Sequence, residues 1–425
     1  MKYEMTEAML FINKICFVSV FYISLAFSAS SLMAETSNPV SPDYTGRKGS
    51  VIYVSKLGDN SNGSSWQKAF HTIQAALLAV PDDQGGHRIV VRPDRYVEAR
   101  LYPIHKGARG AYNALIGDTD GSMGSGATGR VIIDSSCPGV AVRRDESSKH
   151  QYKVYQIIKS DLPESGLKSI DYWGSILVGP ASDKAGNPTN MKFSSISWDR
   201  WALKNLYTSG SDAGFFWDID IIGGEPAGNG FTVIVEDCVS IGRAFGGGVC
   251  YPKVRPEEPC VFRRSYFLSL DWIGDSCGVL IGGCEKEMPK HPHLIMEDCT
   301  LFHTDNALAM SFASRCARVK MNDCRLVVLM FTQKEMGGDK TATGVISTYR
   351  HRPEGRLHVD LEDCILAGYS VFTPNVDPKT ISYTTKGKVQ AYVHYRQPTP
   401  KGFERLGLWP AELFDRIAPP RPQRN

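Results

Sequence analysis

The sequence predicts an all-β solenoid, because two short sequence themes alternate along its second half. The first theme is a hexapeptide that recurs five times, as VIVEDC (233–238), CVFRRS (260–265), LIMEDC (294–299), VKMNDC (319–324) and VDLEDC (359–364). The second theme is a small residue followed by a short apolar strand, at GVCY (248), GVLIGG (278), ALAMSF (307) and GVIST (344). Short apolar strands that repeat at this spacing are typical of stacked β-coils.

Length and charge limit the classes of function. With 425 residues the chain can form one elongated repeat domain, and its formal net charge of +3 is close to balance. A nucleic-acid-binding surface or an acidic solvated tail would need a stronger charge bias. We therefore expect no nucleic-acid partner. Separately, we expect the protein to be a monomer.

Residues 1–34 have the pattern of an export signal. Lys14 precedes the apolar run 15–27, and Ala34 supplies a small residue at a cleavage position. A membrane anchor is the alternative, although a membrane span needs about 20 apolar residues. We expect a secreted, periplasmic or cell-surface protein with no membrane span after cleavage.

The cysteines divide into two groups. Cys238, Cys299, Cys324 and Cys364 occupy one position of the hexapeptide, so we expect them to stack as buried free thiols. Five others lie off this ladder and are candidates for one or two disulfides in an exported protein: Cys250, Cys260, Cys277, Cys284 and Cys316.

The region before the repeats predicts a cap. Residues 35–49 form a polar linker, and a strand at 51–55 precedes an amphipathic helix at about 67–80, with Ser64 or Ser65 as N-cap. The stretch 88–99 predicts a buried strand, a turn at Pro93 and a polar exit. A helix at this place would cover the open end of the first coil.

These residues resemble a known family. The run IYVSKLGDNSNGSSWQKAFHTIQAALLAV, followed by RIVVRPDRYVEA, is similar to the opening of secreted right-handed parallel β-helix proteins of the pectate-lyase-like superfamily. Asp94 stands where that family commonly has Gly. The resemblance implies a right-handed parallel β-helix with three strands per coil, an N-terminal capping helix and an irregular C-terminal cap. On this basis residues 50–375 form the β-helix domain and 376–425 the C-terminal extension.

The resemblance also implies where the binding cleft lies. The GV- and AL-type strands would form the first sheet of each coil, which carries the cleft in that family. The Asp-Cys pairs would fill the bend between the second and third strands, with Cys in place of the Asn that is favoured there.

Two carboxylates are predicted on the first sheet. In FFWDIDIIGG (215–224), Trp217 alternates with Asp218 and Asp220, so the apolar residues face inward and the acids face the cleft. Two carboxylates at this spacing suit a calcium site or an acid/base pair. A solvated strand face is the alternative.

A basic cluster follows a later first-sheet strand. Arg350, His351, Arg352 and Arg356 lie close together in sequence, and arginine forks bind carboxylate or sulfate. The loop 284–293 adds Glu285 and His291 two coils earlier as further substrate-binding candidates. A charged, solubilising loop edge explains the basic cluster equally well. Aromatic residues Trp198, Trp201 and Tyr207 are candidates for sugar stacking or for core packing.

Three functions remain open. The first is a polysaccharide lyase for a uronate- or sulfate-bearing chain, with Asp218, Asp220, Arg350 and His351 as catalytic candidates and calcium as the only candidate cofactor. The second is a glycoside hydrolase that uses Asp218, Asp220 or Glu225. The third is a non-catalytic glycan-binding or surface protein. The Trp-Ile-Asp-His strand of pectate lyases is missing, and Arg352-Pro353-Glu354-Gly355-Arg356 only approximates their Arg-x-Pro-x-x-Arg loop.

Overall fold

The fold is described for most of the repeat region. The computed structural model of the chain describes residues 47–98, 101–134, 176–178, 198–218, 221–222, 225–226, 231–250, 252–269, 277–303, 306–311, 314–328, 344–348, 354–368, 370–372 and 379–392. All of these belong to one compact unit, Val40–Asn425. None of the helices in these segments has the length and apolarity needed to cross a membrane. The predicted signal peptide lies outside the described residues.

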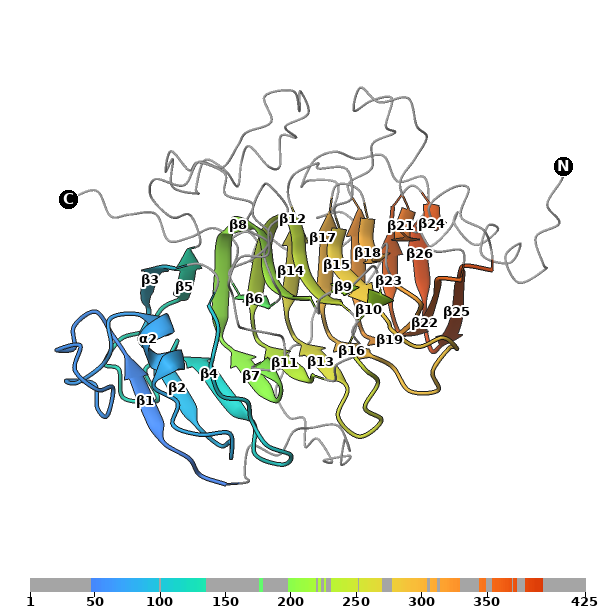
Figure 1. Cartoon of the computed structure of the whole chain (residues 1–425). Coiled ribbons are helices and arrows are strands. Elements are labelled where there is room, and N and C mark those ends of the chain that lie inside the picture. Colours follow the sequence, from blue (N-terminus) through green and yellow to red (C-terminus); the bar gives the residue numbers. More distant parts are fainter. Residues whose placement is uncertain are drawn as a thin grey trace, which may run out of the picture. The chain divides into compact units, whose positions relative to one another are not determined.

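Ten parallel strands form one continuous sheet, which we call sheet A (Figure 1). Each strand of sheet A comes from a successive turn of the chain, and the five hexapeptide strands are consecutive neighbours within it. In spatial order the strands are β1 (Val51–Val54), β2 (Arg88–Val91), β4 (Asn113–Gly117), β7 (Trp201–Lys204), β11 (Val233–Glu236), β13 (Cys260–Arg263), β16 (Leu294–Glu297), β19 (Cys316–Asn322), β22 (Arg356–Glu362) and β25 (Ile381–Lys386).

The other strands form two rows that join into a single sheet, sheet B. The row that follows the bend after sheet A, the third-strand row, contains β3 (Asp94–Val97), β5 (Val131–Asp134), β14 (Tyr266–Ser269), β17 (Thr300–His303), β20 (Arg325–Val328), β23 (Ile365–Ala367) and β26 (Gln390–Tyr392). The row that precedes sheet A, the first-strand row, contains β6 (Ile176–Val178), β15 (Cys277–Gly282), β18 (Asn306–Met310), β21 (Gly344–Thr348) and β24 (Ser370–Phe372).

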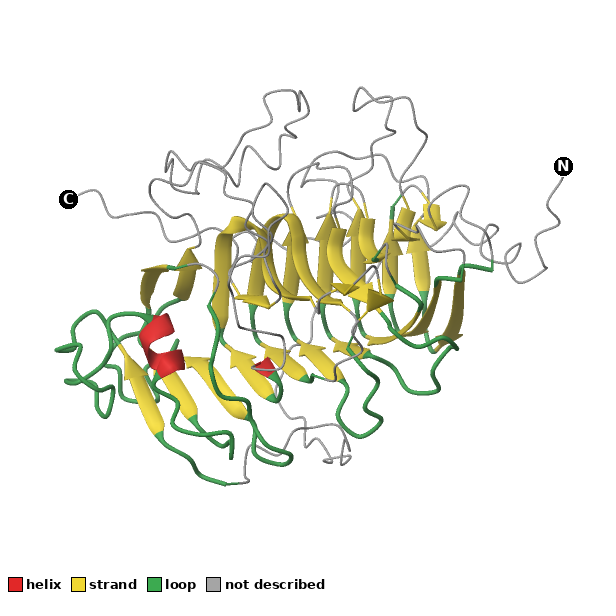
Figure 2. Ribbon diagram, viewed as in Figure 1, coloured by secondary structure: helices red, strands yellow, loops and turns green. Residues whose placement is uncertain are grey.

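Two long strands connect the rows. β8 (Leu206–Asp218) and β12 (Val239–Cys250) begin in the third-strand row and end in the first-strand row. The coil therefore repeats first strand, sheet A strand, bend and third strand. A short antiparallel hairpin, β9 (Ile221–Ile222) with β10 (Glu225–Pro226), stands apart from the coils. The predicted right-handed parallel β-helix with three strands per coil is confirmed, and strands make up nearly all of its regular structure (Figure 2).

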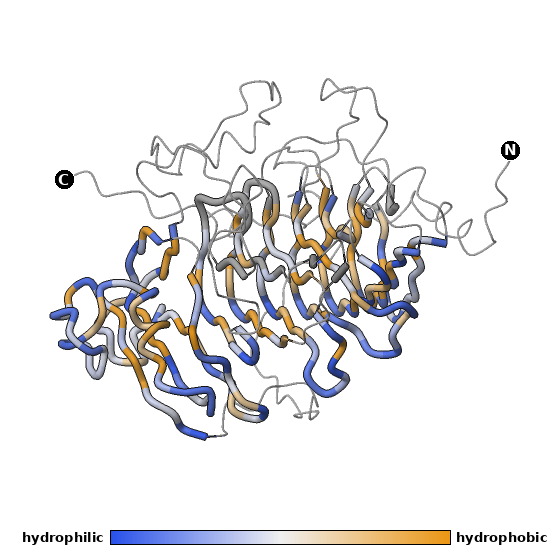
Figure 3. The backbone as a smooth tube through the Cα atoms, viewed as in Figure 1, coloured by the Kyte–Doolittle hydropathy of each residue, from blue (hydrophilic) through white to orange (hydrophobic). Residues whose placement is uncertain are grey.

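The core is the interior of the coil. In the sheet A strands alternate residues point inward, as Val233 and Val235 do, and these are fully buried. Hydrophobic residues are concentrated in the strands, whereas the loops are largely hydrophilic (Figure 3). The alternation of apolar and polar residues along a strand therefore indicates which side chains point into the coil and which point out of it.

The Asp of each Asp-Cys pair turns the chain. Asp237, Asp298, Asp323 and Asp363 all have φ values of 49–53°, and Asn205 at the same register position has a φ of 56°. Asp and Asn tolerate this left-handed conformation better than most residues. It is therefore Asp, and not Cys as the family pattern implied, that occupies the place of the Asn.

The following Cys points inward and links neighbouring coils, as predicted. The Cys299 thiol lies 3.4 Å from the Glu297 carbonyl oxygen in its own turn and 3.3 Å from that of Phe262 in the preceding coil. Ser265 replaces Cys in one coil, and its hydroxyl donates to the Arg263 carbonyl in the same way. All nine described cysteines are free thiols, so the suggested disulfides among the five off-ladder cysteines are not formed.

The one hexapeptide that departs from the template relieves carboxylate repulsion. The last residues of consecutive sheet A strands form a charged column of Lys204, Glu236, Arg263, Glu297, Asn322, Glu362 and Lys386. Arg263 lies between two carboxylates and contacts Glu236 at 3.3 Å and Glu297 at 2.6 Å. At the adjacent bend, Arg264 donates two hydrogen bonds to Asp237, at 2.7 and 2.9 Å. Two arginines at this coil therefore separate acids that would otherwise stack on each other.

The N-terminal helix is shorter than the sequence predicted. Helix α2 spans Ile73–Leu78 and its N-cap is Thr72, whose side chain accepts from the Ala75 N–H. The preceding residues do not become helical because Phe70 pairs with β1, donating its N–H to the Tyr53 carbonyl. Glu98 accepts from the N–H groups of Ile73 and Gln74 and so holds the start of the helix against the first coils.

The coil also extends beyond residue 375. β25 pairs in register with β22, and β26 pairs with β23, so parallel pairing continues to Tyr392. Gly387, with a φ of 64°, takes the bend position of this last described coil. The polar exit at 94–97 is likewise a strand, β3, and not a loop. The rest of the predicted C-terminal extension, from residue 393, lies outside the described residues.

The role of Arg264 at the bends can be tested by restoring the template residue. Arg264 has a φ of 43°, a conformation that Asp and Asn both adopt more easily than Arg, so the comparison is between Arg264→Asp and Arg264→Asn. Both variants lose the Asp237 ion pair, but only Asp adds a carboxylate between Asp237 and Asp298, and we expect the Asp variant to be less stable by about 1 kcal/mol. Urea unfolding measures this difference, which should shrink as salt is added. Equal stability of the two variants would contradict the assigned role of Arg264.

Candidate functional site

The acidic candidate Asp218 lies where strand β8 ends in the first-strand row. Asp218 is the last residue of β8 and pairs with Cys250 of β12. Trp217 beside it is fully buried, which agrees with the predicted alternation. The side chain of Asp218, and Asp220 as a whole, lie outside the described residues. The backbone of Glu225 is in β10, and its side chain is not described.

The basic candidates follow another strand of the same row. β21 ends at Thr348 and β22 begins at Arg356, so Arg350, His351 and Arg352 fall in the connection between them, outside the described residues. Arg356 itself is exposed. The end of β21, at Thr348, lies at the same edge of the sheet as Asp218.

The strand order sets the distance between these groups. Asp218, Cys250 and Gly282 are register partners, and β15, β18 and β21 continue the row to Thr348. Four strand spacings separate Asp218 from Thr348, which amounts to roughly 19 Å. Asp218 and Thr348 thus mark two ends of a row that runs along the coil axis, and the end of β15 lies midway.

The outer face of the first-strand row carries little polar chemistry. Cys250, Leu280, Ala309 and Ser347 occupy outward positions, and all four are buried, with exposures of 7 % or less. Among the described side chains of this row, exposed polar groups are therefore found at the strand ends and in the loops after them.

The loop after β15 contains a preorganised acid–histidine pair. His293 is buried, and its Nδ1 accepts from the Arg318 N–H at 3.0 Å, which places the ring hydrogen on Nε2. That Nε2 donates to Glu285 at 2.5 Å, and Glu285 also accepts from the Val254 N–H. Both ring nitrogens are occupied, so His293 cannot form a metal pair with His291, which is exposed.

The pair fixes the charge of Glu285. Burial opposes ionisation, but the hydrogen bonds from the neutral His293 ring and from the Val254 N–H outweigh it and lower the pKa of Glu285 to about 2. The carboxylate is therefore ionised and already has three hydrogen-bond donors, the His293 ring and the N–H groups of Val254 and Cys284. Glu285 lies at the same edge of the sheet as Asp218, where a substrate contact was predicted. Its hydrogen bonds show that it holds the loop after β15 in place.

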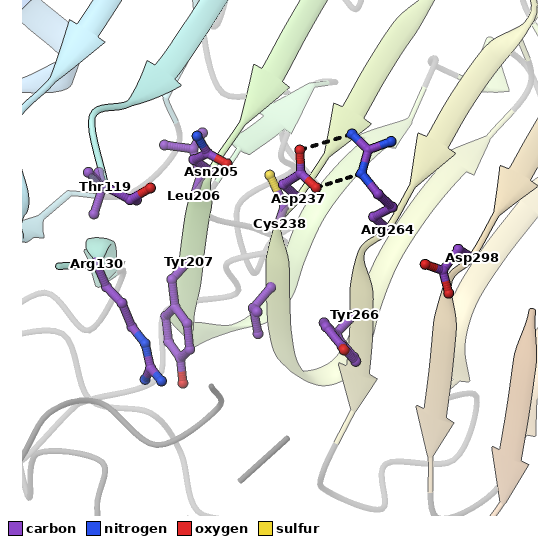
Figure 4. A pocket seen from close by; sticks show the side chains of 12 residues that line it. Thr119, Arg130, Asn205, Leu206, Tyr207, Asp237, Cys238, Arg264, Tyr266 and Asp298 are labelled. Carbon is purple, nitrogen blue, oxygen red and sulfur yellow. Dashed lines mark hydrogen bonds and ion pairs between the residues drawn. The ribbon is translucent and has the colours of Figure 1, made fainter. Parts of the chain in front are cut away.

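Another polar hollow, which we call the bend groove, lies over the bends after sheet A (Figure 4). It has a volume of about 590 Å³. Its lining includes Arg130 and Tyr207 at one end, Asp237 and Arg264 in the middle, and Tyr266 and Asp298 at the other end. In Figure 4, Tyr207 and Tyr266 point to the same side of the third-strand row.

Sequence reasoning missed most of the bend groove. Tyr207 was a stacking candidate, whereas Trp198 and Trp201 are fully buried and pack edge-to-face with ring centroids 5.4 Å apart. Tyr266 was not singled out. Aligning the residue after each hexapeptide would have found it, since that position points outward in every coil.

No three or more His, Cys, Asp or Glu side chains in the described segments form a metal cluster. Asp218 and Asp220 supply the oxygen ligands that calcium prefers, but the register partners Cys250 and Gly282 add no carboxylate. The described part of this site is thus too small to define a calcium centre.

The chain was compared with known proteins. No protein-family model and no curated protein matches it. Among solved structures it is similar to pectate lyase Pel9A (11% identity, TM-score 0.44, 84% of this chain and 82% of that chain) and to a rhamnogalacturonan lyase (12%, 0.40, 76% and 70%). It is also similar to XylC, whose structure is a complex with xylose (10%, 0.35, 80% and 69%). Our fold assignment rests on the strand pairing itself, and these proteins' activities are not transferred to this chain.

The Glu285–His293 pair predicts a pH-dependent contribution to stability. A carboxyl group whose pKa is depressed on folding stabilises the protein above its unfolded pKa, here near 4.5, and this stabilisation is lost as the pH falls toward about 2. We expect the stability gap between wild type and Glu285→Gln to be constant above pH 5 and to narrow below pH 4.5. Chemical unfolding at several pH values measures it.

The control for this measurement is Glu287→Gln, an exposed glutamate in the same loop. The difference between this variant and wild type should not show the same narrowing. A Glu285→Gln gap that stays constant down to pH 2 would refute the assigned role of the pair.

Proposed function

We propose that the protein is a carbohydrate-active β-helix protein that cleaves an anionic polysaccharide by β-elimination. The observation that carries this proposal is the row of edge positions along the coil axis, from Asp218 through the loop after β15 to the connection after β21. Polar residues spread over five parallel strands suit an extended polymer better than a small molecule.

The basic cluster supplies the chemistry of the proposed reaction. In a lyase, a base removes the proton α to the uronate carboxylate, which a cation neutralises. A double bond forms between the α and β carbons as the bond to the β-oxygen breaks, and that oxygen leaves with a proton from water or from the protonated base. Arg350 or His351 would act as the base. Arg352 and Arg356 would bind the carboxylate or sulfate groups of the chain.

The spacing of the edge positions gives the acids a different role. Because roughly 19 Å separates Asp218 from the end of β21, one reacting bond is too small to engage both groups. We assign Asp218 and Asp220 to substrate binding, with calcium as their candidate ligand, and route no catalytic step through the metal. Glu285 and His291 would line the middle of the chain's path.

We also propose that the protein acts outside the cytoplasm as a monomer. The support for the location is the export pattern of residues 1–34. N-terminal sequencing of the exported protein should find Glu35 as its first residue, and a retained leader would contradict export by cleavage.

The proposed base can be tested by substitution. A panel of anionic and neutral polysaccharides is digested, and both new reducing ends and the ultraviolet absorbance of unsaturated uronate are followed. On the cleaved substrate, Arg350→Ala or His351→Ala should lower the rate by about 100-fold or more, since removal of a general base costs 10²–10⁴. Lys320→Ala, an exposed cation on sheet A, is the control.

The same assay separates the alternatives. Reducing ends without absorbance would identify a hydrolase, in which case Asp218→Asn should abolish turnover. Full activity of both basic-cluster variants would remove the lyase centre from this loop. Binding without any product would identify a non-catalytic glycan-binding protein.

A further inference from the structure

We propose that the bend groove binds a neutral oligosaccharide chain that lies along the coil axis. This site is separate from the proposed cleavage site and does not depend on it. Tyr207 lies near the start of β8 and Asp218 at its end, eleven residues further along the same strand (218 minus 207). The chain turns between the two rows within that strand, so the two sites are at different edges of the coil.

The floor of the bend groove presents flat surfaces to a ligand. Tyr207, Val239 and Tyr266 are register partners on three adjacent strands, so the two tyrosines are roughly 10 Å apart. Tyr266 and Val239 are partly exposed. Tyr207 is buried, and the Arg130 guanidinium lies over its ring at 5.6 Å from the centroid. The floor therefore consists of an aromatic ring, an aliphatic side chain and a stacked guanidinium plane, which suit the C–H faces of successive sugar rings.

The rim is polar and also follows the axis. Asn205, Asp237, Arg264 and Asp298 stand at the bends of four consecutive coils. The side chain of Arg264 is 48 % exposed and that of Asp298 is 54 % exposed. These planar groups offer paired donors and acceptors, which match the vicinal hydroxyl groups of a sugar.

The charges select a neutral ligand. Two arginines, Arg130 and Arg264, and two carboxylates, Asp237 and Asp298, line the groove, so the formal charges of its lining cancel. Lys204 and Arg325, just outside the lining, each pair with one of these carboxylates. Arg264 is committed to Asp237 by two hydrogen bonds, and Asp298 accepts from Arg325 at 3.0 Å. An anionic chain would have to break such pairs or meet the carboxylates. A nucleic acid would need an excess of positive charge that the groove lacks.

The binding test uses the whole mature protein and defined probes. Isothermal titration calorimetry is run with neutral hexasaccharides of β-glucan, xylan, mannan and galactan, and with hexagalacturonate as the anionic comparison. We expect at least one neutral hexasaccharide to bind, with an affinity that changes by less than about twofold with added salt, because no net charge is neutralised.

Variants of Tyr266 test the floor directly. Tyr266→Ala should weaken binding by about tenfold or more, since it removes a stacking surface, whereas Tyr266→Phe should stay within about twofold of wild type. The control is Tyr383→Ala, an exposed tyrosine on β25, which should bind like wild type. Val239→Trp leaves the Tyr266 ring in place but fills the space between the two tyrosines, so it should abolish binding.

Three results would overturn the proposal. They are the absence of binding by every neutral hexasaccharide, binding of hexagalacturonate alone, and unchanged affinity in both Tyr266→Ala and Val239→Trp. Loss of cleavage in Arg350→Ala with neutral-chain binding intact would show that the two sites are independent. Failure of the cleavage proposal therefore leaves this test unaffected.

Discussion

The in-register stacking of the bends after sheet A determines most of this structure. In seven consecutive coils, from Asn205 to Gly387, one residue lies in the left-handed region at the same position, and among residues with a side chain Asp and Asn adopt it at the least cost. The Cys that follows then points inward, and its thiol meets carbonyl groups of two consecutive coils. A shift of one residue would turn this thiol outward and the carboxylate inward. The bend therefore fixes the register of both sheets.

Carboxylates that stack at the same position of neighbouring coils repel one another, and arginines in the sequence reduce this repulsion. A column that carries Asp in every coil brings carboxylates within about 5 Å of one another. Arg263 and Arg264 interrupt both the strand-end column and the bend column. The same substitution places a partly exposed guanidinium in the bend groove, so a residue that stabilises the coil also shapes a surface that a ligand can use.

The repeat made the fold predictable, because periodic burial is a local property of the sequence. The Asp-Cys and small-apolar themes indicated both sheets, the inward thiols and the order of the strands. Local signals failed where a distant partner decides the outcome: Phe70 joins β1 and so shortens the helix, and β25 continues the coil with almost no apolar pattern. The types of the candidate site residues indicated which reactions they could support, but the sequence did not indicate the distances between them. The strand order shows that Asp218 and the end of β21 are four strand spacings apart.

The proposed function requires a polymer to lie across five strands of the first-strand row, from Asp218 at the end of β8 to the connection after β21. The most direct test is the dependence of cleavage on chain length, measured as kcat/KM for a size series of oligosaccharides of the cleaved polysaccharide. The account predicts that kcat/KM rises with each added unit until the oligomer spans the row, and then levels off. A disaccharide or trisaccharide cleaved as efficiently as the polymer would contradict it.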